Sequence, residues 1–254
     1  ATINFGDPAP TITPVYPDGV SPIAGVTCAI YSGSPYDATT LVTGTPVPGT
    51  YIIRCTGPAS TTIDGALTFL QYTSGTLTVA KTPLTITAAS ASKNYGSTKT
   101  FAGSEYTVTG TLQPGDAITS VTLTSAGAPQ SSSVGSYSIT PSAAAGTGLS
   151  NYQITYVPGT LDVIKANTVT VTAVDYSFRR LSTPDPLTYQ ATGFINGESF
   201  ATTGNSAPTC KAYDGTDTEV SVTSTMLVGS YAIKCSGATA PNYNLVAVDG
   251  TLLV

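Results

Sequence analysis

The chain of 254 residues carries nine Lys and Arg against fourteen Asp and Glu, so its net charge is −5. Only 9% of its residues are charged, whereas about a quarter are charged in an average globular protein. The composition argues against a disordered chain, because 41% of the residues are hydrophobic, and against nucleic-acid binding, because the few basic residues are scattered.

One sequence pattern occurs three times along the chain. Each copy has a tyrosine after a Gly-Ser or Gly-Thr pair, at Tyr51, Tyr137 and Tyr231, and each copy later closes on Gly-Thr-Leu. The tyrosines are 86 and 94 residues apart, about the length of a small autonomous domain. Thr, Val, Tyr and Ile favour strands, and the 25 Gly and 18 Pro favour turns, so the chain is predicted to be all-β. The three predicted tandem domains, called repeats 1, 2 and 3, are residues 1–80, 83–165 and 168–254.

Repeat 1 lacks a strand that the other two repeats contain. Residues 1–8 align with residues 91–98 of repeat 2, and repeats 2 and 3 place a strand before this point, at residues 83–88 and 168–173. Two explanations are open: the chain belongs to a longer one, or a neighbouring chain supplies the strand. An unpaired sheet edge invites strand addition. Head-to-tail strand addition, or end-to-end docking of the two termini, would build a filament.

The other elements are expected to be short. In repeat 1, strands are expected at residues 11–16 and 26–30, on either side of a turn at residues 17–19. No segment keeps a 3.6-residue apolar period. We therefore expect at most one short helical turn per repeat, at residues 112–116 and 195–199.

The strand around the repeated tyrosine alternates between apolar and polar positions. Tyr51, Ile53 and Cys55 share one face, and the same alternation recurs after Tyr137 and Tyr231. A period of two residues indicates a half-buried strand. These tyrosines are therefore expected to pack in or beside the core.

Each repeat closes with a turn and a final strand. The dipeptides at residues 74–75, 158–159 and 249–250 all end in glycine, and we expect these glycines to supply the positive φ of a tight hairpin turn. The joins between repeats are short, at residues 80–82 and 164–167. Short joins leave little hinge, so the repeats are expected to form an elongated rod.

Repeats 1 and 3 each contain two cysteines, separated by 27 and 25 residues, whereas repeat 2 has Leu123 and Pro141 at the aligned positions. A disulfide requires that the two cysteines occur together or are both absent, and the three repeats fulfil this condition. The alternative of a zinc site is disfavoured, because the chain has no His and no Cys-x-x-Cys motif. Disulfides favour an extracellular setting. The predicted disulfides are Cys28–Cys55 and Cys210–Cys235.

The motifs resemble a known family. Repeat 2 carries Asn-Tyr-Gly at residues 94–96, and repeat 1 carries Asn-Phe-Gly at residues 4–6. In repeat 2 this motif is followed by Tyr-x-Val-x-Gly, a Gly-Asp turn, Gly-Ser-Tyr-x-Ile, Asn-Tyr-x-Ile and Gly-Thr-Leu-x-Val. This is similar to the MBG/YDG-type repeat modules of bacterial surface proteins and adhesins. Repeat 3 departs from the pattern with Arg-Arg-Leu at residues 179–181. The resemblance implies immunoglobulin-like sandwiches or grasp-like β domains that act as stalk, spacer or ligand-presenting unit, with no catalytic residues.

The sequence offers little chemistry beyond this. The absence of His removes the commonest general base, and neither an enzyme nor a cofactor is expected. Asp214, Asp217 and Glu219 are a candidate calcium site, although a solvated turn explains them equally well and is favoured. No lysine is expected in an apolar strand position, so an intramolecular Lys–Asn bond is not expected.

Three functions follow for a non-enzymatic extracellular protein without a membrane span. The first is the stalk or spacer of an adhesin, in contact with neighbouring repeats. The second is a subunit of a self-assembling filament, in contact with copies of itself. The third is a module that binds a surface glycan through exposed tyrosines, for which Tyr31 with Tyr36, and Tyr152 with Tyr156, are the candidates.

Overall fold

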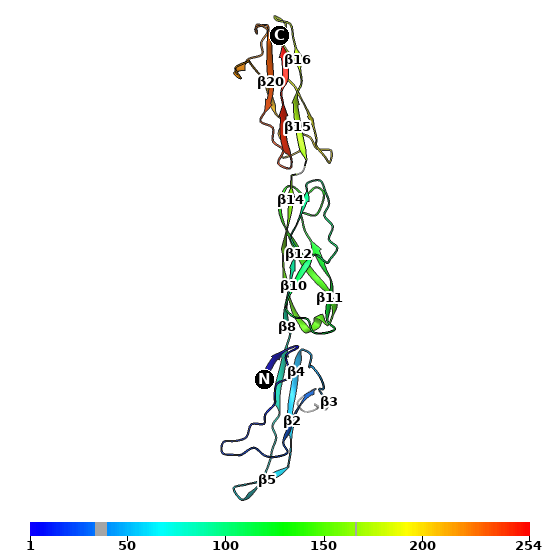
Figure 1. Ribbon diagram of the computed structural model, residues 1–254, viewed down its shortest axis with the longest axis vertical. Coiled ribbons are helices and arrows are strands. Elements are labelled where there is room, and N and C mark those ends of the chain that lie inside the picture. The colour runs from blue at the N-terminus through cyan, green and yellow to red at the C-terminus, as the bar shows by residue number, and fades with distance from the viewer. Residues whose placement is uncertain (34–39, 166) are drawn as a thin grey trace. The chain divides into compact units, whose positions relative to one another are not determined.

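The computed structural model of the chain describes residues 1–33, 40–165 and 167–254 (Figure 1). In these residues the regular structure is β-strand apart from one 3-10 turn, Leu149–Asn151, which confirms the all-β prediction. The chain divides into two compact units. The first comprises residues 1–87, 106–122 and 142–157, and the second comprises residues 88–105, 123–141 and 158–254.

Repeat 2 contains two sheets. The first has the strand order β10-β8-β13 and the second the order β11-β12-β14-β9. Strand β8 runs parallel to β13, from the pair Thr82↔Tyr152 to Thr87↔Val157, and β9 runs parallel to β14. The strands are β8 (Thr82–Ala88), β9 (Ala91–Asn94), β10 (Tyr106–Thr109), β11 (Ala117–Thr124), β12 (Gly135–Thr147), β13 (Tyr152–Val157) and β14 (Gly159–Ile164).

Repeat 3 repeats this arrangement. Its sheets have the orders β17-β15-β21 and β16-β22-β20-β18-β19, and the pairs β15 with β21 and β16 with β22 are again parallel. In repeats 2 and 3 these sheets form an immunoglobulin-like sandwich, which is one of the two predicted β architectures. The strands are β15 (Thr168–Ala173), β16 (Tyr176–Ser177), β17 (Tyr189–Thr192), β18 (Thr209–Tyr213), β19 (Glu219–Val220), β20 (Ser230–Ser236), β21 (Asn244–Val248) and β22 (Gly250–Leu253).

Repeat 1 has only one of the two sheets. The order is β1-β7-β4-β2-β3, with a separate hairpin of β5 and β6, and β1 pairs with β7 in parallel as β9 pairs with β14. Within the described residues, residues 11–16 are not a strand, contrary to the prediction. The strands are β1 (Thr2–Asn4), β2 (Thr27–Ser32), β3 (Thr40–Leu41), β4 (Gly49–Thr56), β5 (Ser60–Ile63), β6 (Ala66–Phe69) and β7 (Gly75–Ala80).

Repeat 2 and repeat 1 differ in the described residues that precede the parallel strand pair. In repeat 2, β10 is bonded to β8, and β8 buries Leu84, Ile86 and Ala88 on alternate positions. Repeat 1 has no counterpart of β8 in the described residues, so its second sheet has no centre. The described residues 7–26 accordingly contain no strand.

The buried core uses the same motif positions in all three repeats. The leucines of the three Gly-Thr-Leu motifs, Leu77, Leu161 and Leu252, are fully buried. In repeats 2 and 3 the isoleucine two residues after the repeated tyrosine, Ile139 and Ile233, is fully buried as well. The predicted period-two alternation therefore places the core residues correctly in these strands.

Two local predictions are wrong. Residues 112–116 and 195–199 contain β-turns, closed by bonds from Asp116 N–H to the Gln113 carbonyl and from Glu198 N–H to the Ile195 carbonyl, both 3.0 Å. The helical turn lies instead at Leu149–Asn151.

The three closing glycines are not among the residues with positive φ. A Cβ on Gly159 would lie 2.5 Å from the Ala88 carbonyl oxygen, and one on Gly250 would lie 2.7 Å from the Ala173 carbonyl oxygen. These glycines are required because the first strand of the repeat passes close to them.

The structure joins both predicted cysteine pairs. Cys28–Cys55 links directly opposed residues of β2 and β4, and Cys210–Cys235 links directly opposed residues of β18 and β20. In repeat 2, Leu123 and Pro141 are buried. Apolar side chains therefore take the place of the bridge there.

Candidate functional site

A buried tyrosine and an acidic turn form a specific polar arrangement in repeat 2. The Tyr152 hydroxyl donates to Asp116 Oδ2 at 2.7 Å and accepts a hydrogen bond from the Gln113 N–H at 2.7 Å. Gln113 and Asp116 are the two ends of one β-turn. We call Gln113, Asp116 and Tyr152 the first seat, because a residue of the preceding repeat lies on it.

Repeat 3 builds the same arrangement from different side chains. The Tyr243 hydroxyl donates to Glu198 Oε2 at 2.5 Å and accepts from the Ile195 N–H at 3.4 Å. Ile195 and Glu198 are again the two ends of the turn. We call Ile195, Glu198 and Tyr243 the second seat.

Phe5 of repeat 1 packs on the first seat, and all residues of this contact belong to the first compact unit. The Phe5 ring meets the Tyr152 ring edge to face, with centroids 5.6 Å apart and an interplanar angle of 89°. The Phe5 carbonyl accepts from Thr82 Oγ1 at 2.5 Å. Gly6 has φ 88°, and a Cβ there would lie 2.1 Å from Gln113 Nε2, so the seat requires glycine next to the aromatic residue.

Tyr95 of repeat 2 packs on the second seat, and this contact lies within the second compact unit. The rings of Tyr95 and Tyr243 are edge to face, with centroids 5.5 Å apart. The Tyr95 hydroxyl donates to Glu198 Oε1, so Glu198 accepts from two tyrosines. A Cβ on Gly96 would lie 2.0 Å from Ile195 Cδ1, which repeats the close approach of the first seat.

Two further hydrogen bonds surround the second seat. The Val134 N–H donates to Asn242 Oδ1 at 2.9 Å, and Gln130 Nε2 donates to Asn196 Oδ1. Asn242 belongs to the Asn-Tyr motif and Asn196 to the acidic turn. The motif residues of repeat 3 therefore contact repeat 2 as well as their own repeat.

The seats keep their tyrosines protonated. Burial raises the pKa of Tyr95, Tyr152 and Tyr243 above the ordinary value of 10.0. For Tyr95 and Tyr243, the hydrogen bond to Glu198 and its negative charge raise the pKa further. A protonated hydroxyl can donate to the carboxylate, which is the contact that the seat uses.

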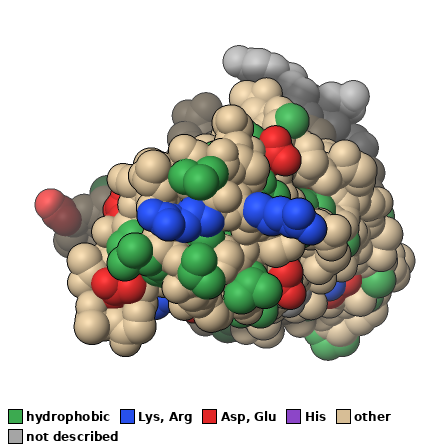
Figure 2. All heavy atoms as spheres, turned by 90° about the horizontal axis from the view of Figure 1, so that it is seen from above, with side chains coloured by type: hydrophobic (Ala, Val, Ile, Leu, Met, Phe, Trp, Pro, Cys, Tyr) green, Lys and Arg blue, Asp and Glu red, His purple; other side chains and the backbone are tan. Residues whose placement is uncertain are grey.

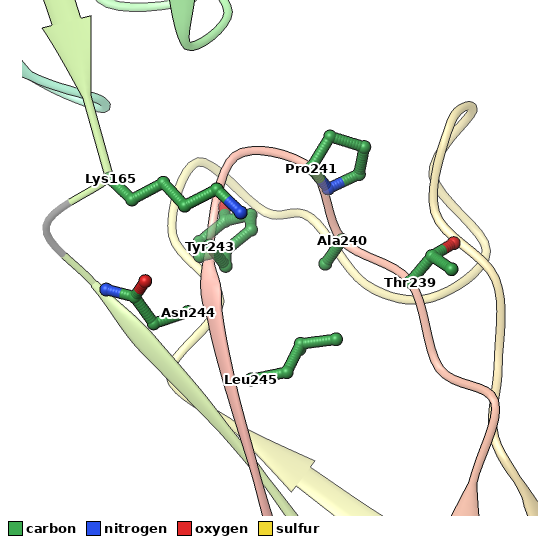
Figure 3. A pocket seen from close by; sticks show the side chains of 7 residues that line it. All are labelled: Lys165, Thr239, Ala240, Pro241, Tyr243, Asn244 and Leu245. Atoms are coloured by element: carbon green, nitrogen blue, oxygen red, sulfur yellow. The ribbon is translucent and has the colours of Figure 1, made fainter.

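A hollow of about 400 Å³ lies beside the second seat (Figure 3). In the figure the Lys165 side chain extends over Tyr243. The residues that line the hollow are Lys165, Thr239, Ala240, Pro241, Tyr243, Asn244 and Leu245. They include one amine, that of Lys165, but they include neither a carboxylate nor a nucleophile that is paired with a general base.

The candidate calcium residues lie in one turn, but each carboxylate has a protein partner. Asp214 Oδ1 accepts from the N–H groups of Thr216 and Thr218 at 2.9 and 3.0 Å. Asp217 pairs with Lys234, and Glu219 pairs with Lys211 at 2.9 Å. Within the described residues, no three His, Cys, Asp or Glu side chains are grouped so that they could hold a metal ion. The hydrogen bonds fit the solvated-turn interpretation.

Of the four tyrosines named for glycan binding, the structure describes Tyr31, Tyr152 and Tyr156. Tyr152 is buried in the first seat, and Tyr156 accepts from the Ala144 N–H at 2.8 Å. Tyr31 is half-buried on β2, and Tyr36 lies outside the described residues.

One lysine does occupy an apolar strand position, so that expectation is wrong. Lys93 on β9 is 8% exposed, and Nζ donates to the carbonyls of Ser97 at 2.8 Å and Ala128 at 3.4 Å, and to that of Pro129. Burial lowers the pKa of Lys93. Its hydrogen bonds join the Asn-Tyr-Gly turn to the loop that follows β11.

Repeat 1 is open where the first strand lies in the other repeats. Gly110 and Gly193 have positive φ, and a Cβ on them would lie 2.8 Å and 2.1 Å from carbonyl oxygens of the first strand's opening residues. Gly19, in the corresponding loop of repeat 1, also has positive φ but nothing within 4 Å. A hollow of about 410 Å³ lies between residues 19–24 and residues 58–64.

The motifs that form the two seats were identified from the sequence, but the contacts between them were not. The core-packing expectation concerned Tyr51, Tyr137 and Tyr231, and nothing predicted that Tyr95 and Tyr243 share one carboxylate. The available signal was the acid of the Gly-Asp or Gly-Glu turn, which occurs in both repeats that have an Asn-Tyr motif. The corresponding turn of repeat 1, at Ala24-Gly25, is followed by Val26.

A family model described as the MBG domain (YGX type) matches residues 84–162 and, a second time, residues 169–253. The tandem arrangement of repeats 2 and 3 is thereby confirmed, while repeat 1 as a third copy remains a prediction. No curated protein matches the chain.

Among solved structures, the chain is similar to the N-terminal four Ig domains of Dscam1 isoform 4.44, with 10% identity over 81% of this chain and 55% of that one, and a TM-score of 0.22. It is also similar to the Bacillus anthracis TIE protein, with 10% identity over 91% of this chain and 52% of that one, and a TM-score of 0.20. The chain spans about half the length of each of these two solved chains.

Proposed function

Because the chain belongs to the MBG-domain family of the YGX type, we propose that it is a non-enzymatic stalk or spacer of an extracellular surface protein. The observation that carries the proposal is the pair of seats. Each seat holds an aromatic side chain of the preceding repeat with a ring contact, and the second adds a hydrogen bond from Tyr95 to Glu198. Such contacts resist bending between repeats.

The two disulfides support an oxidising location. Among the described residues, no helix is both long and apolar enough to cross a membrane. The stalk proposal includes the rod arrangement of the repeats and their attachment outside the cell.

Small-angle X-ray scattering tests the stalk proposal. The chain is expected to give a maximum dimension that matches three domains in a row. The variant Tyr95→Ala removes the side chain from the second seat and should broaden the distribution of distances. A particle as short as one or two domains, or a variant identical to the parent, would contradict the proposal.

A second candidate, the filament subunit, is supported by the open position in repeat 1. Repeat 1 has a hollow beside residues 19–24, and Leu67 and Phe69 of its β5–β6 hairpin are exposed. A strand from another chain could fill the open position by β-augmentation.

The test of the filament adds residues 83–90 in front of Ala1. In repeat 2 these residues directly precede Ala91, which aligns with Ala1. If the parent chain polymerises, the extended chain is expected to stay monomeric in sedimentation velocity. Polymers that persist in the extended chain would eliminate strand completion as their cause.

A further inference from the structure

Repeat 3 contains a turn, at residues 179–181, that corresponds to the Asn-Tyr-Gly turn of repeat 2. In repeat 2 this turn carries Tyr95, which contacts the second seat. Repeat 3 carries Arg-Arg-Leu where repeat 2 carries Asn-Tyr-Gly, and both tripeptides follow a strand paired in parallel with the closing strand. Both turns are closed by the N–H of the following serine, at 3.0 and 3.1 Å. Leu181 has φ 74° and Gly96 has φ 84°. Arg180 therefore stands at the position of Tyr95.

The surface around this turn is apolar and exposed. Val228 is 74% exposed, whereas Val134, its counterpart in repeat 2, is half-buried against the core cluster of the second unit. We call the following residues the end face: Arg180, Leu181, Leu227, Val228 and Leu253, of which the apolar four are all more than half exposed. Figure 2 looks at the molecule from the side on which Figure 1 marks the C-terminus, and shows hydrophobic side chains around Lys and Arg side chains.

The end face also carries an unusual charge for this chain. Arg179 and Arg180 are two of only three arginines in a protein of net charge −5, and both are exposed. Neither has an ion pair within the described residues. Arginine binds carboxylates through two parallel hydrogen bonds, so this position fits an acidic partner.

We propose that the end face docks a further β repeat of the same family, whose turn acid binds Arg180 as Glu198 binds Tyr95. The proposal rests on the stalk function and names the chemistry of its next neighbour. In both seats of this chain the turn ends in an acid, Asp116 or Glu198, at the place where Arg180 would reach. An ion pair thus replaces the hydroxyl–carboxylate bond.

Leu181 restricts the partner further. At the two seats, a Cβ on Gly6 or Gly96 would lie about 2 Å from the side chain of Gln113 or Ile195. A leucine there fits only if the partner has a small residue at the position of Gln113 and Ile195. The partner is therefore a repeat with a small residue, then the turn, then Asp or Glu.

A second copy of this chain does not meet that description at repeat 1. The corresponding turn of repeat 1, at Ala24-Gly25, is preceded by Ile23 and followed by Val26, so it offers neither a small residue before the turn nor an acid after it. Head-to-tail docking of two copies through the end face is therefore disfavoured.

The test extends the full chain rather than dissecting it. Val254 corresponds to Val163, so a second copy of residues 164–254 is appended after Val254, with Ile195→Ala in the appended copy. Linking the two partners gives a high effective concentration. The probe is this appended repeat, and the readout is its melting temperature by differential scanning calorimetry.

Arg180→Ala in the original repeat should lower the melting temperature of the appended repeat by about 6–12 °C, which is the lower end of the shift expected when a domain this size loses one charged hydrogen bond. Glu198→Gln in the appended repeat should lower it at least as much. The double variant should lose little more than Glu198→Gln alone, because Glu198→Gln already removes the contact with Arg180. It should lose more than Arg180→Ala alone, because Glu198 also accepts a hydrogen bond from Tyr243 of its own repeat. Arg179→Ala is the matched control, since it removes the same charge one residue earlier and should leave the melting unchanged.

Three results would overturn the proposal: no effect of Arg180→Ala, an equal effect of Arg179→Ala, or additive effects of the Arg180 and Glu198 changes. Self-association of the unextended chain that Arg180→Ala abolishes would overturn the choice of partner. The calorimetric test of the ion pair is separate from the scattering test of the stalk. A compact particle in scattering would refute the stalk function, but calorimetry would still decide the ion-pair proposal.

Discussion

The shared carboxylate of the second seat gives a sharp stability prediction. Glu198 accepts hydrogen bonds from two buried tyrosines, one on each oxygen. Glu198→Gln keeps the size of the side chain but turns one oxygen into an amide NH₂, which cannot accept a hydroxyl hydrogen. One of the two tyrosine hydroxyls then faces a donor, and a buried polar group without its partner costs about 1–3 kcal/mol.

The first seat supplies the control. Asp116 accepts from one tyrosine only, so in Asp116→Asn the amide can present its remaining oxygen to Tyr152. This variant should lose less stability than Glu198→Gln, although both remove one negative charge from an equivalent turn.

Urea unfolding followed by near-ultraviolet circular dichroism measures the difference. With a slope of about 2 kcal/mol per molar urea, a loss of about 2 kcal/mol moves the midpoint by about 1 M. The midpoint of the transition that includes repeat 3 should fall by roughly this amount in Glu198→Gln. Equal midpoints for Glu198→Gln and Asp116→Asn would refute the idea that the number of hydroxyls on the acid decides the cost.

Four further predictions concern other groups. The folded-state pKa values of the three tyrosines in the seats lie above the ordinary 10.0. Their contribution to stability is therefore complete below about pH 10 and is lost as the pH rises through the folded-state values; absorbance at 295 nm should show these three tyrosines ionising only on alkaline unfolding. A reducing agent should lower the melting of repeats 1 and 3, whose bridges close 27 and 25 residues and stabilise by about 3–4 kcal/mol each, while repeat 2 melts unchanged in the same calorimetric scan. Lys93→Met should destabilise repeat 2 by about 1–3 kcal/mol in urea, because buried carbonyls lose their donor; an unchanged midpoint would show that water replaces the amine. Millimolar calcium should leave the melting temperature as it is in chelator, and a clear rise would restore the Asp214 turn as a cation site.

Period and alternation were enough to predict the sheets, because both are local properties of the sequence. The burial of Leu161 and Ile139 follows from a period of two residues and from the repeated motif. The disulfides followed from comparing the repeats, since the two positions change together. None of these predictions depends on which turn contacts which strand in the folded protein.

The seats depend on contacts between distant segments, so the sequence could not give them in the same way. Tyr95 and Glu198 are 103 residues apart, and nothing local to either residue indicates the other. The closing glycines show the same limit. The motif predicted a turn with positive φ, but Gly159 and Gly250 are glycines because a carbonyl of the first strand lies against them. The apparent turn signal was a packing signal.

The middle residue of the Asn-Tyr-Gly turn and its counterparts makes a different kind of contact in each repeat. At the first seat Phe5 contributes only a ring contact, at the second Tyr95 adds a hydrogen bond to Glu198, and in repeat 3 Arg180 brings a positive charge to an exposed face. The glycine that follows changes in step, since Gly6 and Gly96 abut a side chain whereas Leu181 stands in open surface. A common frame with variable contact residues gives each repeat a preferred neighbour, because a mismatched pair would leave a charge or a hydroxyl without its partner. In the proposed stalk, the order of repeats would therefore be encoded by two residues of the turn, the one at the position of Tyr95 and the one that follows it, rather than by the sheets.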